Sequence, residues 1–225
     1  MRFLGKNIKR VIDLSQPFYD GCPHCPANGM PVLENILTVR KDGANLERII
    51  TSLHTGTHVD APRHLYDELK SIDEYPLESF MGQAVPLKLT NKGCKEPIEA
   101  RDLEKYGNKI GRDDIVLLVT GWGLKRSMTE EWIHNSPYLT EEGALYLAEK
   151  QIKGVGIDHF TVGTTIRDID FATHTALFKA GIWIVEDMFL PEELFSREKW
   201  FFIAMPMNIK GVSGSFVRPV VFDVM

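Results

Sequence analysis

The sequence predicts an α/β protein, with strands dominating its first half and helices alternating with strands in its second half. Short apolar runs bounded by Gly, Pro or Asp fill the region up to residue 89, as is typical of strands. From residue 99 onward, expected helices and strands follow one another in turn, a pattern that favours α/β packing. We see no internal repeat, linker or low-complexity tract. We therefore expect one domain covering residues 1–225.

Composition narrows the class of protein. Hydrophobic residues make up 44% and charged residues 25% of the chain, which is ordinary for a soluble globular protein. The net charge of −5 argues against nucleic-acid binding and does not attract a membrane surface. No apolar run reaches the ~20 residues that span a bilayer, and the basic start has no signal-peptide apolar segment behind it. We expect a cytoplasmic protein with no nucleic-acid or membrane partner.

Four short apolar runs in the first half predict strands, at Val11–Leu14, Val32–Arg40, Leu46–Leu53 and Ala84–Leu89. Asp42-Gly43 is the expected turn between the second and third of these strands. Pro86 lacks a backbone N–H and therefore favours an edge strand or a bulge. Prolines and glycines fill Asp20–Pro31, so we expect an irregular loop there.

The second half predicts three helices and three strands. Thr140 is a good helix N-cap, and Glu141 and Glu142 favour the helix dipole in its first turn. Gly107 and Gly181 are suitable helix ends. The expected order is a helix over Glu99–Tyr106, a strand over Asp114–Val119, a helix opening at Thr140, a strand over Gly154–Asp158, a helix starting between Asp170 and Thr173, and a strand over Ile182–Val185.

Residues 54–64 concentrate candidate metal ligands: His54, His58, Asp60 and His64. Their even spacing would place all four on one face of a strand. Ten steps of ~3.3 Å would nevertheless spread them over about 33 Å, whereas metal–ligand bonds of roughly 2.0–2.2 Å require convergence. The stretch must therefore curl, and Gly56 and Pro62 permit bends. If the stretch were a helix, Asp60 would point away from the histidines and Pro62 would interrupt the helix. The alternative without a metal is a polar loop whose histidines are satisfied by hydrogen bonds.

Two further ligand types lie in the second half. His174 is expected near the start of its helix, and Glu186 follows the next strand. A helix and strand joined at Gly181 would pack antiparallel, which brings these two side chains together. Six ligands in all are enough for two metal ions that share a carboxylate, although each residue alone is more often a cap or a surface group.

The chain has three cysteines, too few for a disulfide framework. Cys22 and Cys25 have CxxC spacing, which is compatible with a redox pair or half a zinc site. There is no second CxxC, and Cys94 stands alone. We expect a proline-rich loop with incidental thiols.

The ligand stretch HTGTHVDAPRH resembles the HxGTHxDxPxH signature of the cyclase family, which includes bacterial kynurenine formamidases and isatin hydrolases. The similarity covers almost the whole chain in family order. Further similar segments are IVLLVTGWG, YLTEEGALYLAEKQIKGVGID, HTALFKAGIWIVEDMFL and MPMNIKGVSGSFVRPVVF.

The resemblance implies a fold of the swivelling β/β/α type, a mixed sheet partly curled into a barrel with outer helices. It implies a homodimer or higher oligomer and a Zn²⁺ centre of one or two ions, with Mn²⁺ as the alternative metal. The implied ligands are His54, His58 and Asp60 for one ion, with Asp60 bridging to a second ion that His64, His174 and Glu186 also hold.

The resemblance also implies a hydrolase that cleaves a C–N bond of a small amide, formamide or lactam, similar to kynurenine formamidase. Zinc lowers the pKa of bound water from about 15.7 to about 7, so a metal-bound hydroxide is the expected nucleophile. His64 is the expected acid/base because imidazole titrates near neutral pH; it cannot hold a metal tightly and transfer protons at once. Asp158 and His159 are secondary candidates.

Two departures from the family pattern fall where substrate would be recognised. Kynurenine formamidases usually carry Trp in the proline-rich loop, where this chain has His24 between two cysteines. After Asp158 the family often has a serine and then an acidic residue, whereas this chain has Thr161, Val162 and Gly163. The resemblance therefore supports the metal chemistry of the family more strongly than it supports the family's substrate.

Two other functions stay open. His58, Asp60 and His174 reproduce the facial triad of a non-haem Fe(II) oxygenase. His54 and Glu186 would then be surplus ligands, and no arginine after His174 is clearly placed to bind a 2-oxo acid. The second alternative is a non-catalytic metal-binding protein with closed coordination.

Overall fold

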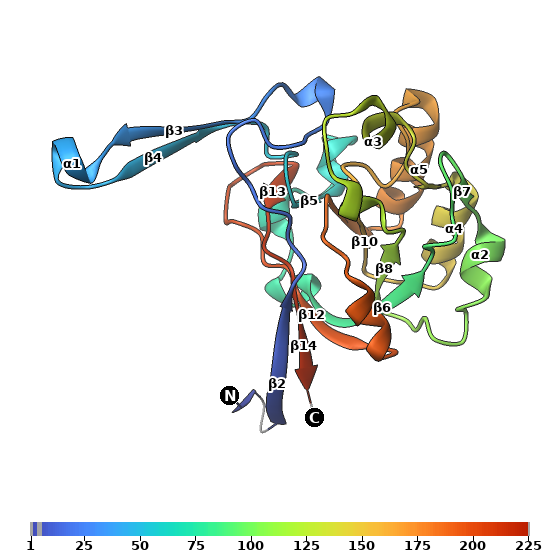
Figure 1. Ribbon diagram of the computed structural model, residues 1–225. Helices are drawn as coiled ribbons and strands as arrows, with labels where there is room; N and C mark the ends of the chain where they lie inside the picture. The colour runs from blue at the N-terminus through green and yellow to red at the C-terminus, as the bar shows by residue number, and fades with distance from the viewer. Residues whose placement is uncertain (1, 4–5, 225) are drawn as a thin grey trace.

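Ten strands form one mixed sheet in the computed structural model, which describes residues 2–3 and 6–224 (Figure 1). In spatial order they are β1 (Arg2–Phe3), β2 (Lys6–Asp13), β14 (Val220–Val224), β12 (Trp200–Ile203), β6 (Met81–Lys88), β8 (Ile115–Val119), β10 (Gly154–Ile157), β11 (Trp183–Glu186), β5 (His58–Asp60) and β13 (Gly214–Phe216). The central strands β6, β8, β10 and β11 are parallel, and antiparallel strands flank them on both sides.

Two short sheets, five α-helices and six short 3-10 helices complete the described elements. The sheets pair β3 (Val32–Leu37) with β4 (Leu46–Ile50) and β7 (Pro97–Ile98) with β9 (Tyr138–Leu139). The helices are α1 (Val39–Asp42), α2 (Ala100–Glu104), α3 (Glu130–His134), α4 (Glu141–Glu149) and α5 (Arg167–Lys179). Helices α2, α4 and α5 lie together beside the parallel strands (Figure 1).

Buried side chains alternate between the two faces of β8, because successive residues of a strand point to opposite sides. Val116 and Leu118 join a core with the helices, which includes Leu147 of α4 and Leu177 of α5. Their neighbours on β8 join a second core that contains residues from strands at both ends of the sheet, such as β2, β14 and β5. Distant strands can share one core only if the sheet curls.

The curled mixed sheet with outer helices confirms the predicted fold class. The expectation of one domain over residues 1–225 stays a prediction. None of the helices in the described part of the chain is both long and apolar enough to cross a bilayer.

Pro86 was predicted to mark an edge strand or a bulge, yet β6 is internal to the sheet, between β12 and β8. The strand β12 pairs only with residues 81–84 of β6, whereas β8 pairs with residues 84–88. Pro86 therefore lies where the β12 side of the strand is already unpaired. Its missing N–H costs no ladder hydrogen bond to β12 there.

Several predicted boundaries were wrong. The helix α5 begins at Arg167, ahead of the predicted start, so His174 lies in the middle of it. Its N-cap residue, Ile166, makes no side-chain capping bond, which explains why the sequence carries no clear start signal. The predicted turn at Asp42-Gly43 is instead the end of α1, with Gly43 as a left-handed C-cap. Most other predicted elements match to within a few residues, although β2 begins five residues before its predicted start. The sequence did not predict α3 or short strands such as β7, β9, β12, β13 and β14.

The β3–β4 hairpin extends away from the rest of the molecule as an arm (Figure 1). Both strands pair only with each other in the described structure, and every residue of β4 is exposed. Large apolar side chains on the arm are about half exposed or more: Ile36, Val39, Leu46, Ile49 and Ile50.

Candidate metal centre

Strand β5 and its two neighbours position the candidate ligands. His58 and Asp60 are two residues apart on β5, so both side chains point to the same face. The register places Glu186 of β11 opposite His58, and Gly214 of β13 opposite Asp60. Glu186 is the last residue of a parallel strand, and ligand sites in α/β sheets form at such carboxyl ends.

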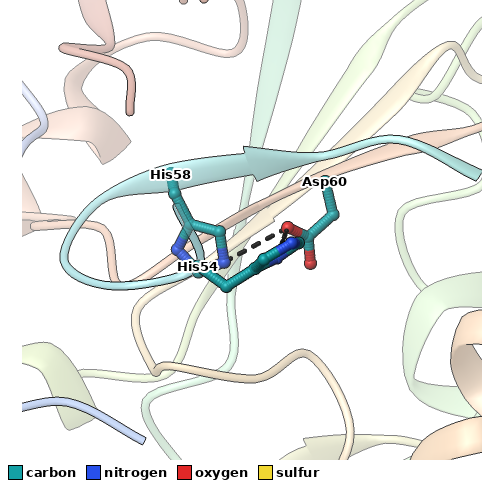
Figure 2. Close-up of side chains that lie close together, drawn as sticks. All are labelled: His54, His58 and Asp60. Atoms are coloured by element: carbon teal, nitrogen blue, oxygen red, sulfur yellow. Dashed lines mark ion pairs between the residues drawn. The ribbon is translucent and has the colours of Figure 1, made fainter. Parts of the chain in front are cut away.

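The predicted curl of residues 54–64 is present. Gly56 has a left-handed φ of 68°, which folds His54 back over β5, and Pro62 opens a short 3-10 helix over Pro62–His64. His54, His58 and Asp60 point toward one another (Figure 2). His54 Nδ1 lies 2.6 Å and His58 Nε2 lies 3.2 Å from Asp60 Oδ1. Donor atoms of all three lie within 4.8 Å of one another.

Asp60, His174 and Glu186 form a second triad, again with donor atoms within 4.8 Å of one another. His174 Nε2 lies 3.4 Å from Glu186 Oε1, and His58 Nε2 lies 3.6 Å from Glu186 Oε2. Asp60 belongs to both triads. The structure therefore brings together five of the six predicted ligands, as two groups that share one carboxylate.

Hydrogen bonds from the surrounding backbone orient the ligands. His58 Nδ1 lies 2.8 Å from the carbonyl of Gly56, and His174 Nδ1 lies 2.9 Å from the carbonyl of Asp170. A carbonyl only accepts, so each Nδ1 carries a proton and each Nε2 is the nitrogen that faces the triads. The amide of Val162 donates to Glu186 Oε1 at 2.7 Å, which holds that carboxylate in place.

The ligand atoms of the two triads fit a divalent cation. His58 Nε2 and Asp60 Oδ1 are buried and lack a hydrogen-bond partner among the described residues, although they lie within ion-pair distance of each other. Buried polar atoms without partners are costly. Imidazole nitrogens and carboxylate oxygens at these separations are suitable ligands for zinc or a similar ion.

Without a cation, protonated histidines balance the charge of the buried carboxylates. Burial would lower the pKa of His58, but the carboxylates of Asp60 and Glu186 outweigh it and raise that pKa to about 9. Burial is likewise outweighed at His174, where Glu186 and Asp170 raise the pKa to about 10. Burial opposes ionisation of Asp60, but the adjacent His54 and His58 hold its pKa well below the usual range. Metal ions must therefore displace protons here.

The two triads lie at a cavity of about 430 Å³. His64 also lines it, with its ring centroid 4.1 Å from that of His54. Desolvation lowers the pKa of His64 to about 4 against the opposing charge of Asp60, and the charges of His54 and His174 act with desolvation. His64 lies outside both triads, and its predicted roles as ligand and as acid/base stay predictions.

The other residues that the sequence singled out divide between cavity and interior. Thr161 lines the cavity, and its hydroxyl donates to Asp170 Oδ1 at 2.6 Å. Asp158 is buried against Thr120, and His159 lies between Ser136 and the carbonyl of Trp132. His24 is turned toward the carbonyl of Cys22. The last three are not among the residues that line this cavity, which favours structural roles for them.

The sequence reasoning missed several residues of the cavity wall. Asp170 lines it four residues before His174, and this i, i+4 spacing on a helix is a signal that could have identified it. No local pattern marks the others, because they come from separate loops and helices: Asn28, His134, Phe160, Arg167 and Phe171. Cys25 also lines the cavity, in the loop where the sequence departs from the formamidase pattern.

These features define an α/β protein with paired candidate metal sites at an open cavity. The sequence profile of the family described as "Putative cyclase" matches residues 12–164. The chain therefore belongs to the cyclase family.

Among curated relatives, a kynurenine formamidase of Bacillus thuringiensis (strain Al Hakam) is 29% identical over 93% of this chain and 96% of its own length. A solved structure described as a potential metal-dependent hydrolase with cyclase activity is 28% identical, with a TM-score of 0.79 over 95% of this chain and 98% of the other. Isatin hydrolase A from Labrenzia aggregata, solved with benzyl benzoate, is 24% identical with a TM-score of 0.84, over 95% of this chain and 93% of the other. This last similarity supports the fold alone.

Proposed function

We propose that the protein is a metal-dependent hydrolase that cleaves the C–N bond of a small amide, formamide or lactam. The observation that carries the proposal is the pair of ligand triads that share Asp60 at an open cavity. The kynurenine formamidase relatives and the metal-dependent hydrolase structures of similar sequence support it.

Zn²⁺ is the proposed metal and Mn²⁺ the alternative, with two sites of unequal affinity because Asp60 must serve both. A bound ion of this kind supplies a water of lowered pKa and polarises a carbonyl oxygen. The chain orients its own ligands through the carbonyls of Gly56 and Asp170. Phe160 and Phe171 give the cavity an apolar wall, which favours an aromatic or similarly apolar substrate.

His64 is the proposed proton carrier for the leaving nitrogen. Its ring borders the cavity beside His54, and it stands outside both triads, so it is free to exchange a proton while the triads hold metal. Its lowered pKa leaves it neutral near pH 7. It would therefore act first as a base and return the proton as an acid.

The test combines metal analysis with hydrolysis assays on N-formylkynurenine, isatin and a simple aryl formamide. We expect two ions, one removed by mild chelation before the other, and metal-dependent hydrolysis of at least one substrate. We expect N-formylkynurenine to be a weak substrate, because Thr161 and the His24 loop depart from the formamidase pattern. Oxygen-dependent turnover, or no turnover of any amide by the metal-loaded protein, would contradict the proposal.

We also propose that the protein is a homo-oligomer in which the β3–β4 arm packs against a second copy. A lone two-stranded hairpin is marginal in water, and this one exposes several large apolar side chains. Leu46→Glu on the arm should shift the mass measured by light scattering toward the monomer. Leu145→Glu on α4 is the control, because both leucines are 49% exposed. A monomeric wild type, or the same mass for both variants, would contradict this proposal.

A further inference from the structure

Arg126 and Asp187 form a buried ion pair beside the metal centre. Their side chains are only 6% and 1% exposed. Arg126 Nε lies 2.9 Å from Asp187 Oδ1, and Nη2 lies 2.7 Å from Oδ2, which is the two-pronged geometry that a guanidinium makes with a carboxylate. Neither residue belongs to a ligand triad, and neither lines the cavity.

The same guanidinium holds one wall of the cavity. Nη2 donates to the carbonyl of Pro23 at 2.8 Å, and Nη1 donates to the carbonyl of Pro17 at 3.3 Å. Both carbonyls belong to residues 17–28, here called the wall segment, which contributes Cys25 and Asn28 to the cavity. Asn28 Nδ2 in turn donates to the carbonyl of His54 at 2.7 Å. The wall segment therefore connects Arg126 to a candidate ligand.

The other end of the ion pair fixes the chain next to Glu186. Asp187 has a φ of 52°, a left-handed conformation that non-glycine residues adopt rarely and at a cost. Its amide donates to the carbonyl of His159, and its carbonyl accepts from the Thr57 hydroxyl, each at 2.6 Å. Such a backbone persists only when its surroundings hold it, and Arg126 supplies the charged part of that support.

We propose that Arg126 and Asp187 are positioning residues that lock the wall segment over the metal centre and thereby control substrate binding. The inference rests on the proposed function for its kinetic readout only. Its structural content, the fixing of residues 17–28, is testable without any turnover.

The first test compares Arg126→Lys with the wild type. Lysine keeps the charge, but a single ammonium cannot bind a carboxylate through two parallel bonds and reach two carbonyls as well. We expect amide hydrogen exchange of the wall segment to become faster while two Zn²⁺ ions still bind. With the aryl formamide, we expect KM to rise at least ~10-fold and kcat to fall less, for a total loss of about 10²-fold in kcat/KM, as misplaced binding groups cause.

Lys92→Gln is the matched control. Lys92 forms a comparably buried pair with Asp102, at 2.6 Å with side-chain exposures of 6% and 8%, and it also binds the carbonyl of Pro97. It does not line the metal cavity. We expect this variant to lower the melting temperature but to leave KM and wall-segment exchange unchanged.

A second variant distinguishes loss of the ion pair from general destabilisation of the fold. Asp187→Asn should speed wall-segment exchange as Arg126→Lys does, and the double variant should add little to the larger single effect, because both remove one interaction. The inference is overturned if Arg126→Lys melts earlier, as Lys92→Gln does, but keeps wild-type exchange in residues 17–28. If the wild type hydrolyses no amide, the proposed function fails and the exchange comparison alone decides the inference.

Discussion

Gly214 offers a selective way to remove His54 from the first triad. Gly214 lies opposite Asp60 in the β13–β5 register, and the His54 ring lies directly over it. A Cβ at position 214 would come within 2.5 Å of His54 Cε1 and 2.9 Å of both ring nitrogens. Carbon atoms pack at roughly 3.5–4.0 Å, so in Gly214→Ala the ring must move by about 1 Å.

The expected loss of Zn²⁺ affinity follows from how little displacement of a ligand a metal site tolerates. Ligand distances hold to within about 0.2 Å, so a shift of about 1 Å removes His54 as an effective ligand. The shift also strains the contact of 3.0 Å between His54 Nε2 and Ser213 Oγ. Disturbing the support of a ligand typically costs 10–100-fold in metal affinity, and we expect at least that loss for one ion. The Asp60, His174 and Glu186 triad should keep the other ion.

Calorimetric titration of the metal-free protein with Zn²⁺ measures both affinities. Overpacking costs about 1–3 kcal/mol of stability, so the control must carry a similar strain elsewhere. Gly143→Ala on α4 does so, because its Cβ would lie 2.8 Å from Leu139 Cδ1 and from the carbonyl of Ile98. We expect Gly143→Ala to melt earlier with both Zn²⁺ affinities intact. Unchanged affinities in Gly214→Ala would refute the assignment of His54 as a ligand.

Four further predictions concern the other residues of the candidate metal centre. Asp60→Asn should weaken both ions, because the amide carries no charge to share between two cations; normal metal content by elemental analysis would show that Asp60 is not a ligand. His64→Ala should keep both ions but lose roughly 10²–10⁴-fold in turnover; loss of one ion, with activity restored by excess metal, would make His64 a ligand instead. The raised pKa values of His58 and His174, about 9 and about 10, predict that Zn²⁺ binding at pH 8 releases about two protons. In the metal-free protein, these groups stabilise the fold fully below their ordinary pKa of 6.5 and lose that contribution as pH rises through about 9 to 10. Titration in buffers of different ionisation enthalpy, and melting curves against pH, measure these two effects.

The ligand stretch was predictable because metal geometry constrains it strongly. Candidate ligands at this spacing cannot meet on a straight strand, so a bend was expected, and Gly56 provides one with its left-handed φ. The approach of His174 to Glu186 followed from a helix and a strand joined by a tight turn. That conclusion survived an error in the helix start, because the two residues lie in elements that pack side by side whether α5 begins at residue 167 or 170.

The cavity wall was not predictable in the same way. His24 and Cys25 are neighbours in sequence, yet Cys25 lines the cavity and His24 turns away to the carbonyl of Cys22. The direction of each side chain depends on contacts more than a hundred residues away, such as the bond from Arg126 to Pro23. The position of Pro86 in an internal strand has a similar cause, since the length of β12 decides where β6 becomes an edge.

The candidate ligands and the cavity wall come from different parts of the chain, and this separates the metal chemistry from the choice of substrate. Three of the five residues in the two triads lie within residues 54–60, so one local bend assembles most of the candidate metal centre. The wall comes from at least three other segments, including residues 25–28 and the region from Phe160 to Phe171. Substitutions there can change the shape of the cavity while the triads keep their backbone supports at Gly56 and Asp170. This arrangement explains physically why a chain can keep the metal chemistry of the cyclase family and still differ in the amide that it cleaves.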